Sequence, residues 1–220
     1  MGHALSEAAS AREDVRLSAG RADVFVDFSA PVALESHLEQ ARGAGKPILI
    51  GTTGLSEEHQ TLIDAAAGEI AVIQAANTSL GVNLLTHLVR EAAARLGTDW
   101  DIEISEMHHR RKVDAPSGTA LLLGQAAADG RGVELDSVAD RARDGITGPR
   151  ESGHIGFAAL RGGTVAGEHQ VIFAADGERL ELGHRAESRA IFARGAIEAA
   201  LWLAGKPAGR YSMADVLGLQ

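Results

Sequence analysis

The side chains best suited to chemistry lie close together in residues 106–120, EMHHRRKVDAPSGTA. Within this stretch, His108, His109 and Lys112 can supply and remove protons near neutral pH. Pro116 is followed by Ser-Gly-Thr and an apolar run, an order typical of a helix N-terminus. The free backbone N–H groups and the positive dipole end of such a helix bind carboxylates and phosphates. An anion site beside proton donors suits an enzyme that acts on a small carboxylated substrate.

Other interpretations of the same stretch stay open. The basic run is equally well explained as a solvated loop, and Pro-Ser-Gly-Thr alone is more often an ordinary helix cap than a ligand site. A metal site built on the histidine pair is disfavoured, because adjacent residues on a strand point to opposite faces. Nucleic-acid binding is disfavoured because the net charge is −9 and no aromatic residue lies between the basic ones.

The composition favours an ordinary globular protein and excludes several kinds of site. The 220 residues include no cysteine, which rules out disulfides, thiolate catalysis and sulfur-based zinc sites. No apolar run approaches the roughly 18 residues of a membrane span, and the N-terminus lacks a signal-peptide core. We therefore expect a cytoplasmic protein that binds neither nucleic acid nor membranes and has no metal. With 26 glycines and 4% aromatic residues, the core is expected to be aliphatic and rich in alanine.

The first third of the chain has the pattern of a parallel sheet covered by helices. Apolar runs at 23–28, 47–50 and 70–73 predict buried strands. Helices are expected to begin at Pro31 and after Ser56, between these strands. Strands that alternate with helices in this way are typical of a doubly wound α/β fold.

Two loops directly follow strands of this predicted sheet. Ligands of open α/β sheets bind at the carboxyl ends of the strands, so both loops are candidates for a ligand site. Taken separately, each is equally well explained as a simple turn. The loop residues are Gly51, Thr52 and Thr53 after the second strand, and Ala75, Ala76, Asn77 and Thr78 after the third.

A different pattern follows a long helix expected to begin at Ser79. Residues 101–105 alternate like a half-exposed strand, and residues 156–182 contain alternating segments with a hairpin signal at Asp176-Gly177. Alternation and hairpins predict a mostly antiparallel sheet, and hence a second α+β domain.

The remaining segments complete the predicted organisation. Residues 129–153 lack periodicity and predict an exposed loop, whereas residues 188–204 predict a final helix. We therefore expect an incomplete Rossmann-like, nucleotide-binding domain formed by residues 1–78 and 190–220. Residues 79–189 are expected to form a domain for substrate binding and oligomerisation.

From about Asp23 to its C-terminus, the chain resembles the 4-hydroxy-tetrahydrodipicolinate reductase (dihydrodipicolinate reductase) family. The long motif E-x-H-H-x-x-K-x-D-A-P-S-G-T-A carries this resemblance, with VFVDFSAP, ILIGTTG, AANTSLGVN, IGFAALRGG, GEHQVIF and SRAIFARGAIEAALWL. The resemblance implies reduction of 4-hydroxy-tetrahydrodipicolinate to tetrahydrodipicolinate in lysine and diaminopimelate biosynthesis. It also implies NADPH or NADH as hydride donor, a small dicarboxylate substrate and a homotetramer.

The resemblance also implies roles for individual residues. His108 corresponds to the acid/base residue of the family and Lys112 to its proton donor. His109 corresponds to a substrate contact, and Gly118 and Thr119 to the residues that bind a substrate carboxylate. The loop residues Gly51, Thr52 and Thr53, with Ala75, Ala76, Asn77 and Thr78, correspond to the nicotinamide side of the cofactor cleft.

The N-terminal region departs from the family pattern. The family begins with a strand and a Gly-x-x-Gly-x-x-Gly phosphate loop, whereas this sequence opens at Met1-Gly2 with a helix expected at 4–11. Residues 15–18 resemble the family's second strand, but Gly20 then leads almost directly into the strand that follows. We therefore expect a shortened nucleotide domain with weakened cofactor binding. The alternative function is a non-catalytic, shortened family member that cannot bind cofactor.

Overall fold

The structure is a computed structural model that describes residues 1–18 and 21–219. The chain forms two compact units, described separately below. Unit 1 comprises Met1–Asn83 and Ala190–Gln220, and unit 2 comprises Leu84–Arg189. No helix in the described part of the chain is both long enough and apolar enough to cross a membrane.

Unit 1 is built on a parallel sheet of four strands in the order β1-β2-β3-β9. Its central strand β2 is the run Ile48–Ile50, which is buried on both faces and therefore apolar at every position. The elements of unit 1 are α1 (Gly2–Ser10), β1 (Phe25–Asp27), a 3₁₀ turn (Pro31–Ala33), α2 (Leu34–Gly43), β2, α3 (Glu57–Ala67), β3 (Ala71–Gln74), α7 (Ala190–Leu203), β9 (Gly209–Tyr211) and α8 (Met213–Leu217).

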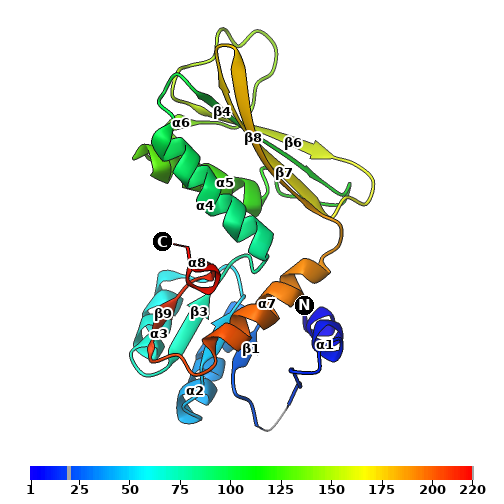
Figure 1. The fold of residues 1–220 in the computed structure, drawn as a ribbon, viewed down its shortest axis with the longest axis vertical. Coiled ribbons are helices and arrows are strands. Elements are labelled where there is room, and N and C mark those ends of the chain that lie inside the picture. Colours follow the sequence, from blue (N-terminus) through cyan, green and yellow to red (C-terminus); the bar gives the residue numbers. More distant parts are fainter. Residues whose placement is uncertain (19–20, 220) are drawn as a thin grey trace. The chain divides into compact units, whose positions relative to one another are not determined.

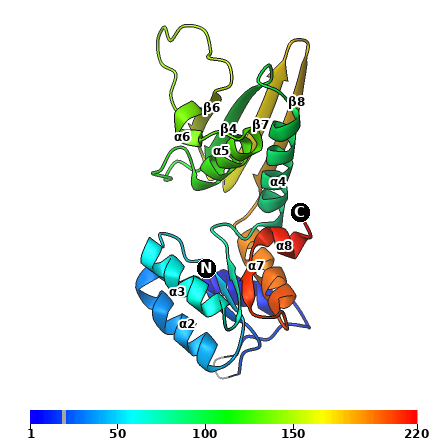
Figure 2. The same ribbon diagram turned by 90° about the vertical axis from the view of Figure 1, so that its left-hand side faces the viewer.

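Helices cover both faces of this sheet (Figures 1 and 2). On one face, α2 and α3 pack through residues such as Leu34 and Ile63 against Ile48 and Ile50. On the other face, α7 and α8 pack against Leu49 and Ile73. The predicted α/β class is therefore confirmed, and the small side chains of α7 make its core alanine-rich as expected.

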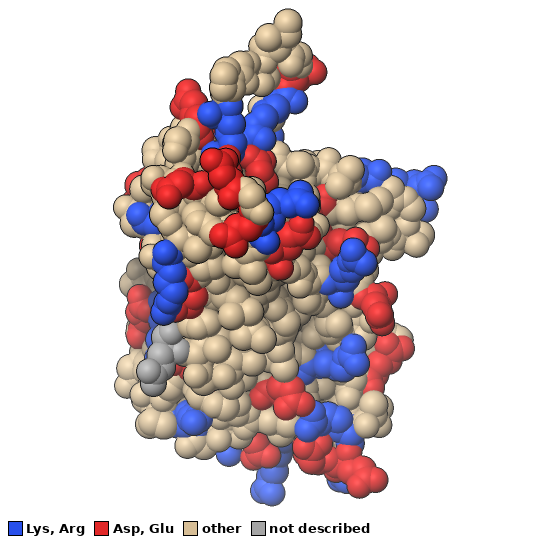
Figure 3. All heavy atoms as spheres, turned by 45° about the horizontal axis from the view of Figure 1, so that its top comes forward, with Lys and Arg blue, Asp and Glu red and all other residues tan. Residues whose placement is uncertain are grey.

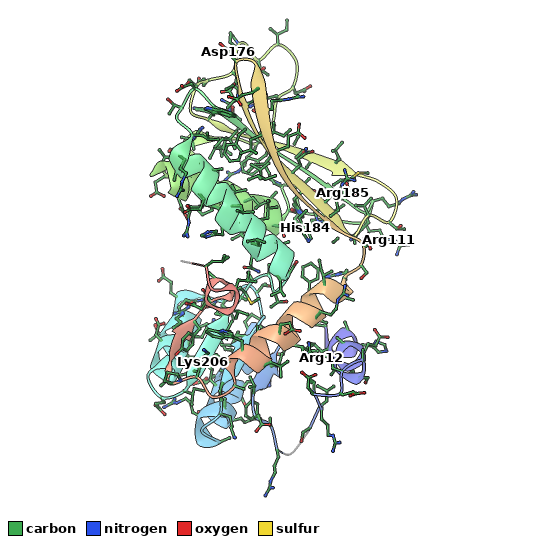
Figure 4. The ribbon with its side chains drawn as sticks, in the orientation of Figure 1. Arg12, Arg111, Asp176, His184, Arg185 and Lys206 are labelled. Carbon is green, nitrogen blue, oxygen red and sulfur yellow. The ribbon has the colours of Figure 1, made fainter. Side chains whose placement is uncertain are left out.

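The N-terminal segment differs from its predicted structure. The helix α1 forms, and the ion pair of Arg12 with Glu198 ties its end to α7 (Figure 4). Residues 15–18, however, form no strand, because no neighbouring strand of the described chain offers them backbone partners. Gly20 lies outside the described residues. The strand β1 is consequently at the edge of the sheet.

Unit 2 is a mixed sheet in the order β5-β6-β4-β7-β8. The pairs β4–β7 and β7–β8 are antiparallel, as expected, whereas β6 runs parallel to β4 and β5. Asp176 marks the predicted hairpin turn between β7 and β8 (Figure 4). The elements of unit 2 are α4 (Leu80–Arg95, which begins in unit 1), β4 (Asp101–His108), α5 (Gly118–Arg131), α6 (Leu135–Val138), β5 (Ala139–Asp140), β6 (Ile155–Arg161), β7 (Gly167–Ala175) and β8 (Glu178–Ala186).

One face of this sheet carries the helices α4 and α5, and their contact forms the core of unit 2 (Figure 1). Ile102, Ile104, Val171 and Phe173 point into this core from alternate positions of β4 and β7. The prediction of one exposed loop over 129–153 is wrong in its first part. There α5 continues to Arg131, and α6 and β5 follow, because Leu135 packs into the same core.

Candidate active site

The strand β4 delivers two polar side chains to the core-facing side of unit 2. Alternation along β4 buries Ile102 and Ile104 and then, by the same period of two, Glu106 and His108. The apolar pair anchors the strand under α5, and the polar pair lies at its carboxyl end. Local strand geometry thus places a carboxylate and an imidazole side by side.

Glu106 is almost fully enclosed and accepts four hydrogen bonds. Its Oε2 lies 2.6 Å from His108 Nδ1 and 2.7 Å from Arg161 Nη1. Its Oε1 accepts from Arg161 Nη2 at 2.8 Å and from the backbone N–H of Ser117 at 3.1 Å. Burial acts to raise the pKa of Glu106, but the hydrogen bonds from Arg161 and His108 outweigh it and hold this pKa below its usual value.

The N-terminus of α5 lies directly beside this pair, as the sequence predicts. Ser117 is the N-cap, and its Oγ accepts the backbone N–H of Ala120 at 3.1 Å. Gly118 is exposed, and nothing lies within 4 Å of the point where a side chain would begin. Thr119 follows as a half-buried residue. The first turn of α5 is thus open to an anionic ligand.

The loop between β4 and α5 carries the other predicted residues. Lys112 Nζ lies 2.8 Å from each carboxylate oxygen of Asp114, and this contact lowers the pKa of Asp114. His109 Nδ1 accepts the backbone N–H of Arg111 at 3.2 Å. Arg161 donates to the backbone carbonyl of Asp114 at 2.7 Å, so the same arginine that binds Glu106 also fixes this loop.

A second histidine joins the site and was not predicted. His169 on β7 is only 6% exposed, and its ring lies 5.1 Å from that of His108 in an edge-on arrangement. Its Nε2 lies 3.0 Å from Ser117 Oγ, whereas its Nδ1 has no hydrogen-bond partner. Burial, followed by the charge of His108, lowers the pKa of His169 to about 4, so this ring is neutral at pH 7.

The cross-strand neighbour of His169 is His184 on β8 (Figure 4). Its burial also lowers its pKa. Sequence reasoning missed Glu106, Arg161 and His169 as members of the site. The signal for Glu106 was available, since it stands two positions before His108 in an alternating strand and so shares its face. Nothing local marks Arg161, because it comes from a different strand.

The two predicted loops of unit 1 leave the adjacent strands β2 and β3 at the carboxyl edge of the parallel sheet. Thr52 is buried and donates through Oγ1 to Asp27 at 3.0 Å. A Cβ on Gly51 would lie 2.1 Å from the ring of Phe28, so a larger residue here would require that ring to move. Thr53 is exposed to solvent.

The second loop is fixed from both sides. Asn77 Oδ1 accepts the N–H of Ser79 at 2.9 Å, and Thr78 Oγ1 donates to the carbonyl of Phe192 at 2.7 Å. Ala75 is buried, whereas Ala76 is exposed. Fixed backbone groups and small side chains at adjacent carboxyl ends are typical of ligand sites in open α/β sheets.

On the face drawn in Figure 3, lysine and arginine side chains are interspersed with aspartate and glutamate. Among the described residues, no group of three or more histidine, aspartate and glutamate side chains is arranged to hold a metal ion.

Unit 1 has a parallel sheet with loops at its carboxyl edge, and unit 2 has an acid–base pair beside a helix N-terminus. Both features are compatible with a dinucleotide-dependent oxidoreductase. Comparison with known proteins identifies the family. The family models "Dihydrodipicolinate reductase, N-terminus" and "Dihydrodipicolinate reductase, C-terminus" match residues 1–78 and 81–217, and the chain belongs to this family. It is an oxidoreductase, and the family uses NAD(P)H as hydride donor.

Two relatives illustrate the similarity in sequence. The 4-hydroxy-tetrahydrodipicolinate reductase of Zymomonas mobilis is 59% identical over 238 residues, covering 100% of this chain and 93% of its own. That alignment is longer than this chain of 220 residues, so the relative has residues within the matched region that are missing here. The reductase of Caulobacter vibrioides is 56% identical and covers 90% of this chain and 78% of its own.

Two solved structures share the fold. A dipicolinate-bound dihydrodipicolinate reductase from Paenisporosarcina sp. TG-14 superposes with a TM-score of 0.79 at 21% identity, covering 97% of this chain and 94% of that one. GenD2 from gentamicin A biosynthesis, in complex with NAD, gives a TM-score of 0.51 at 15% identity, covering 99% of this chain and 87% of that one. At these identities the likeness concerns the fold alone.

Proposed function

We propose that the chain reduces 4-hydroxy-tetrahydrodipicolinate to tetrahydrodipicolinate with NAD(P)H, in lysine and diaminopimelate biosynthesis. The observation that carries this proposal is the Glu106–His108 pair beside the open N-terminus of α5, in a chain 56% and 59% identical to proteins named for this activity. The non-catalytic alternative finds no support among these relatives.

The roles proposed for unit 2 follow from its chemistry. The first turn of α5, with Gly118 and Thr119, binds one substrate carboxylate through backbone N–H groups and the helix dipole. His109 contacts the substrate from the loop. His108 serves as the acid/base residue through Nε2, since its Nδ1 is held by Glu106, and Lys112 donates the proton that completes the reduction.

In unit 1, we assign the nicotinamide side of the cofactor site to the two loops at the sheet edge. When bound, NAD(P)H supplies the hydride, and the chain supplies the proton that must accompany it. Residues 1–78 and 190–220 would thus bind the cofactor, and residues 79–189 the substrate. The loop residues concerned are Gly51, Thr52, Thr53, Ala75, Ala76, Asn77 and Thr78.

The proposal extends to assembly and location. In unit 2, the sheet face opposite α4 and α5 carries no helix in the described part of the chain, and Leu160 is 55% exposed on it. A depression of about 400 Å³ crosses this face near Met107, Leu160 and Gly183. We assign this face to a homotetramer interface, and the protein to the cytoplasm, where the NAD(P)H pool supplies its reaction.

Two substitutions test the assigned chemistry. His108→Gln and Lys112→Ala are each expected to lower kcat by about 10²–10⁴-fold, the usual contribution of a positioned proton donor. Calorimetric titration with NADPH and NADH should give the same affinities as the unaltered chain, because both residues lie in unit 2. Undiminished turnover in both variants would refute the roles. Absence of cofactor binding by folded protein would instead support the non-catalytic alternative.

A further inference from the structure

One buried carboxylate beside His108 transfers no proton in the chemistry assigned so far. The side chain of Glu106 is 1% exposed, and burying a carboxylate is costly unless its charge is matched. We propose that Glu106 is the positioning residue of the site: it fixes the tautomer and ring orientation of His108 and couples that ring to the anion-binding end of α5. The proposal rests on the function proposed above, because it gives Glu106 its role through His108.

The hydrogen bond with Glu106 determines which ring nitrogen of His108 carries the proton. An ionised carboxylate only accepts hydrogen bonds, so a 2.6 Å contact from Oε2 requires that Nδ1 carry the proton. The low pKa of Glu106 keeps the carboxylate ionised at pH 7. The neutral ring is thus held with Nδ1 protonated, and Nε2 is the nitrogen at which a proton arrives or leaves.

The space around Nε2 supports this assignment. A Cβ placed on Gly167 would lie 3.0 Å from His108 Nε2, closer than most real contacts of that kind. Glycine at the start of β7 therefore leaves this nitrogen uncrowded. The ring of His169 packs edge-on against the same imidazole and limits its rotation.

Glu106 also contacts the N-terminus of α5. The other oxygen of Glu106 accepts the backbone N–H of Ser117, the residue that caps α5. Movement of the carboxylate would therefore displace both the imidazole and the helix N-terminus that is assigned to the substrate. Glu106 therefore sets the distance between His108 Nε2, where the proton is exchanged, and the anion site.

Arg161 completes the arrangement by making the carboxylate rigid. Its two terminal nitrogens bind both oxygens in a fork, and it also holds the carbonyl of Asp114 in the loop that carries Lys112. The four acceptor positions of Glu106 are thereby all used, so the carboxylate has one stable orientation. This orientation is set by β6, a strand distant in sequence from β4.

The test replaces Glu106 by its uncharged isostere. In Glu106→Gln, the amide can donate or accept, so the single tautomer of His108 should be lost. We expect kcat to fall about 10–100-fold, the range found when partners that orient metal-bound histidines are removed. KM should change less than about 3-fold, because the amide oxygen can still accept the N–H of Ser117. The tautomer is read without substrate or cofactor from the ¹⁵N chemical shifts of the ring nitrogens, assigned by their loss in His108→Gln.

Glu103→Gln is the matched control. Glu103 lies on the same strand and also binds arginines, Arg143 and Arg150. It stands three positions before Glu106, so its side chain points to the opposite face of the strand. The control should leave the tautomer and kcat unchanged. Retention of the Nδ1–H tautomer and of full turnover in Glu106→Gln would overturn the proposal.

Two further results separate this inference from the proposed function. A changed tautomer with full turnover would sustain the positioning by Glu106 but refute the catalytic role of His108. If Glu106→Gln fails to fold, Glu106→Asp takes its place, because it keeps the charge for Arg161 but shortens the reach to Nδ1. The same loss of the tautomer and fall in kcat are then expected, and their absence overturns the proposal.

Discussion

Among single residues, His169 most directly links the site to the stability of the fold. Burial, then the charge of His108, lowers its pKa from 6.5 to about 4. As the pH falls from 6.5 towards 4, His169 is therefore protonated in the unfolded chain but not in the folded chain. Acid thus stabilises the unfolded state relative to the folded state. We expect the free energy of unfolding to fall by about 2 kcal/mol between pH 7 and 5 from this residue.

Urea titrations at several pH values measure this dependence. His169→Gln removes the titrating ring and should flatten the dependence, whereas His3→Gln, on the exposed helix α1, should not. The measurements are kept above pH 5 because protonation of Glu106 affects the free energy of unfolding only at lower pH. Its depressed pKa gives stability that is complete above its usual value of 4.5 and is lost only as the pH falls further. An unaltered slope in His169→Gln would contradict the assignment.

At this scale, the sequence predicts groups that act locally and misses those that meet through the fold. His108, Lys112 and the cap of α5 lie in one continuous stretch, so their residue types and order suffice. Arg161 lies 55 residues beyond Glu106 and reaches it only because β6 pairs with β4. The register of that pairing depends on core packing, which no local pattern specifies.

At the scale of elements, the contact between α7 and the loop at 75–78 depends on one glycine. A Cβ on Gly195 would lie 1.8 Å from the backbone carbonyl oxygen of Thr78, and backbone cannot move aside as a side chain can. Gly195→Ala should therefore destabilise unit 1 by about 1–3 kcal/mol, although alanine favours helix formation. It should also weaken NADPH binding, because Thr78 belongs to the loop assigned to the cofactor.

Gly43→Ala supplies the comparison for this prediction. Gly43 ends α2, and nothing lies within 4 Å of the added Cβ, so alanine should stabilise the protein by up to about 1 kcal/mol. Denaturant titration measures both variants, and calorimetry measures NADPH binding. A Gly195→Ala variant as stable as Gly43→Ala would show that α7 and this loop are not in close contact.

Elements with a strong local period are the ones that the sequence predicts. The three strands β1, β2 and β3 and the helices α2 and α3 lie within a few residues of their expected positions. The short β9 and α8 were not anticipated, because three to five residues carry too little periodicity to be recognised. Residues 15–18 show the converse, since a strand-like sequence forms no strand without a partner.

At the scale of the whole molecule, the uncovered face of the sheet in unit 2 predicts contact with another copy of the chain. Antiparallel sheets commonly bury one face and expose polar residues to solvent on the other. Here Leu160 is 55% exposed and Met107 and Ile172 are half-buried on the uncovered side. Apolar side chains on a regular sheet face are better explained by contact with another copy than by solvent.

Sedimentation velocity of the purified chain should therefore give the mass of a homotetramer at micromolar concentration. Leu160→Glu places a charge on this face and should produce smaller species, because an unpaired carboxylate opposes burial between subunits. Val32→Glu is the control, since Val32 is 92% exposed and belongs to unit 1 instead of this sheet. A monomeric unaltered chain would refute the assembly. If both variants dissociate to the same extent, the added charge alone explains the effect, and Leu160 does not lie at the interface.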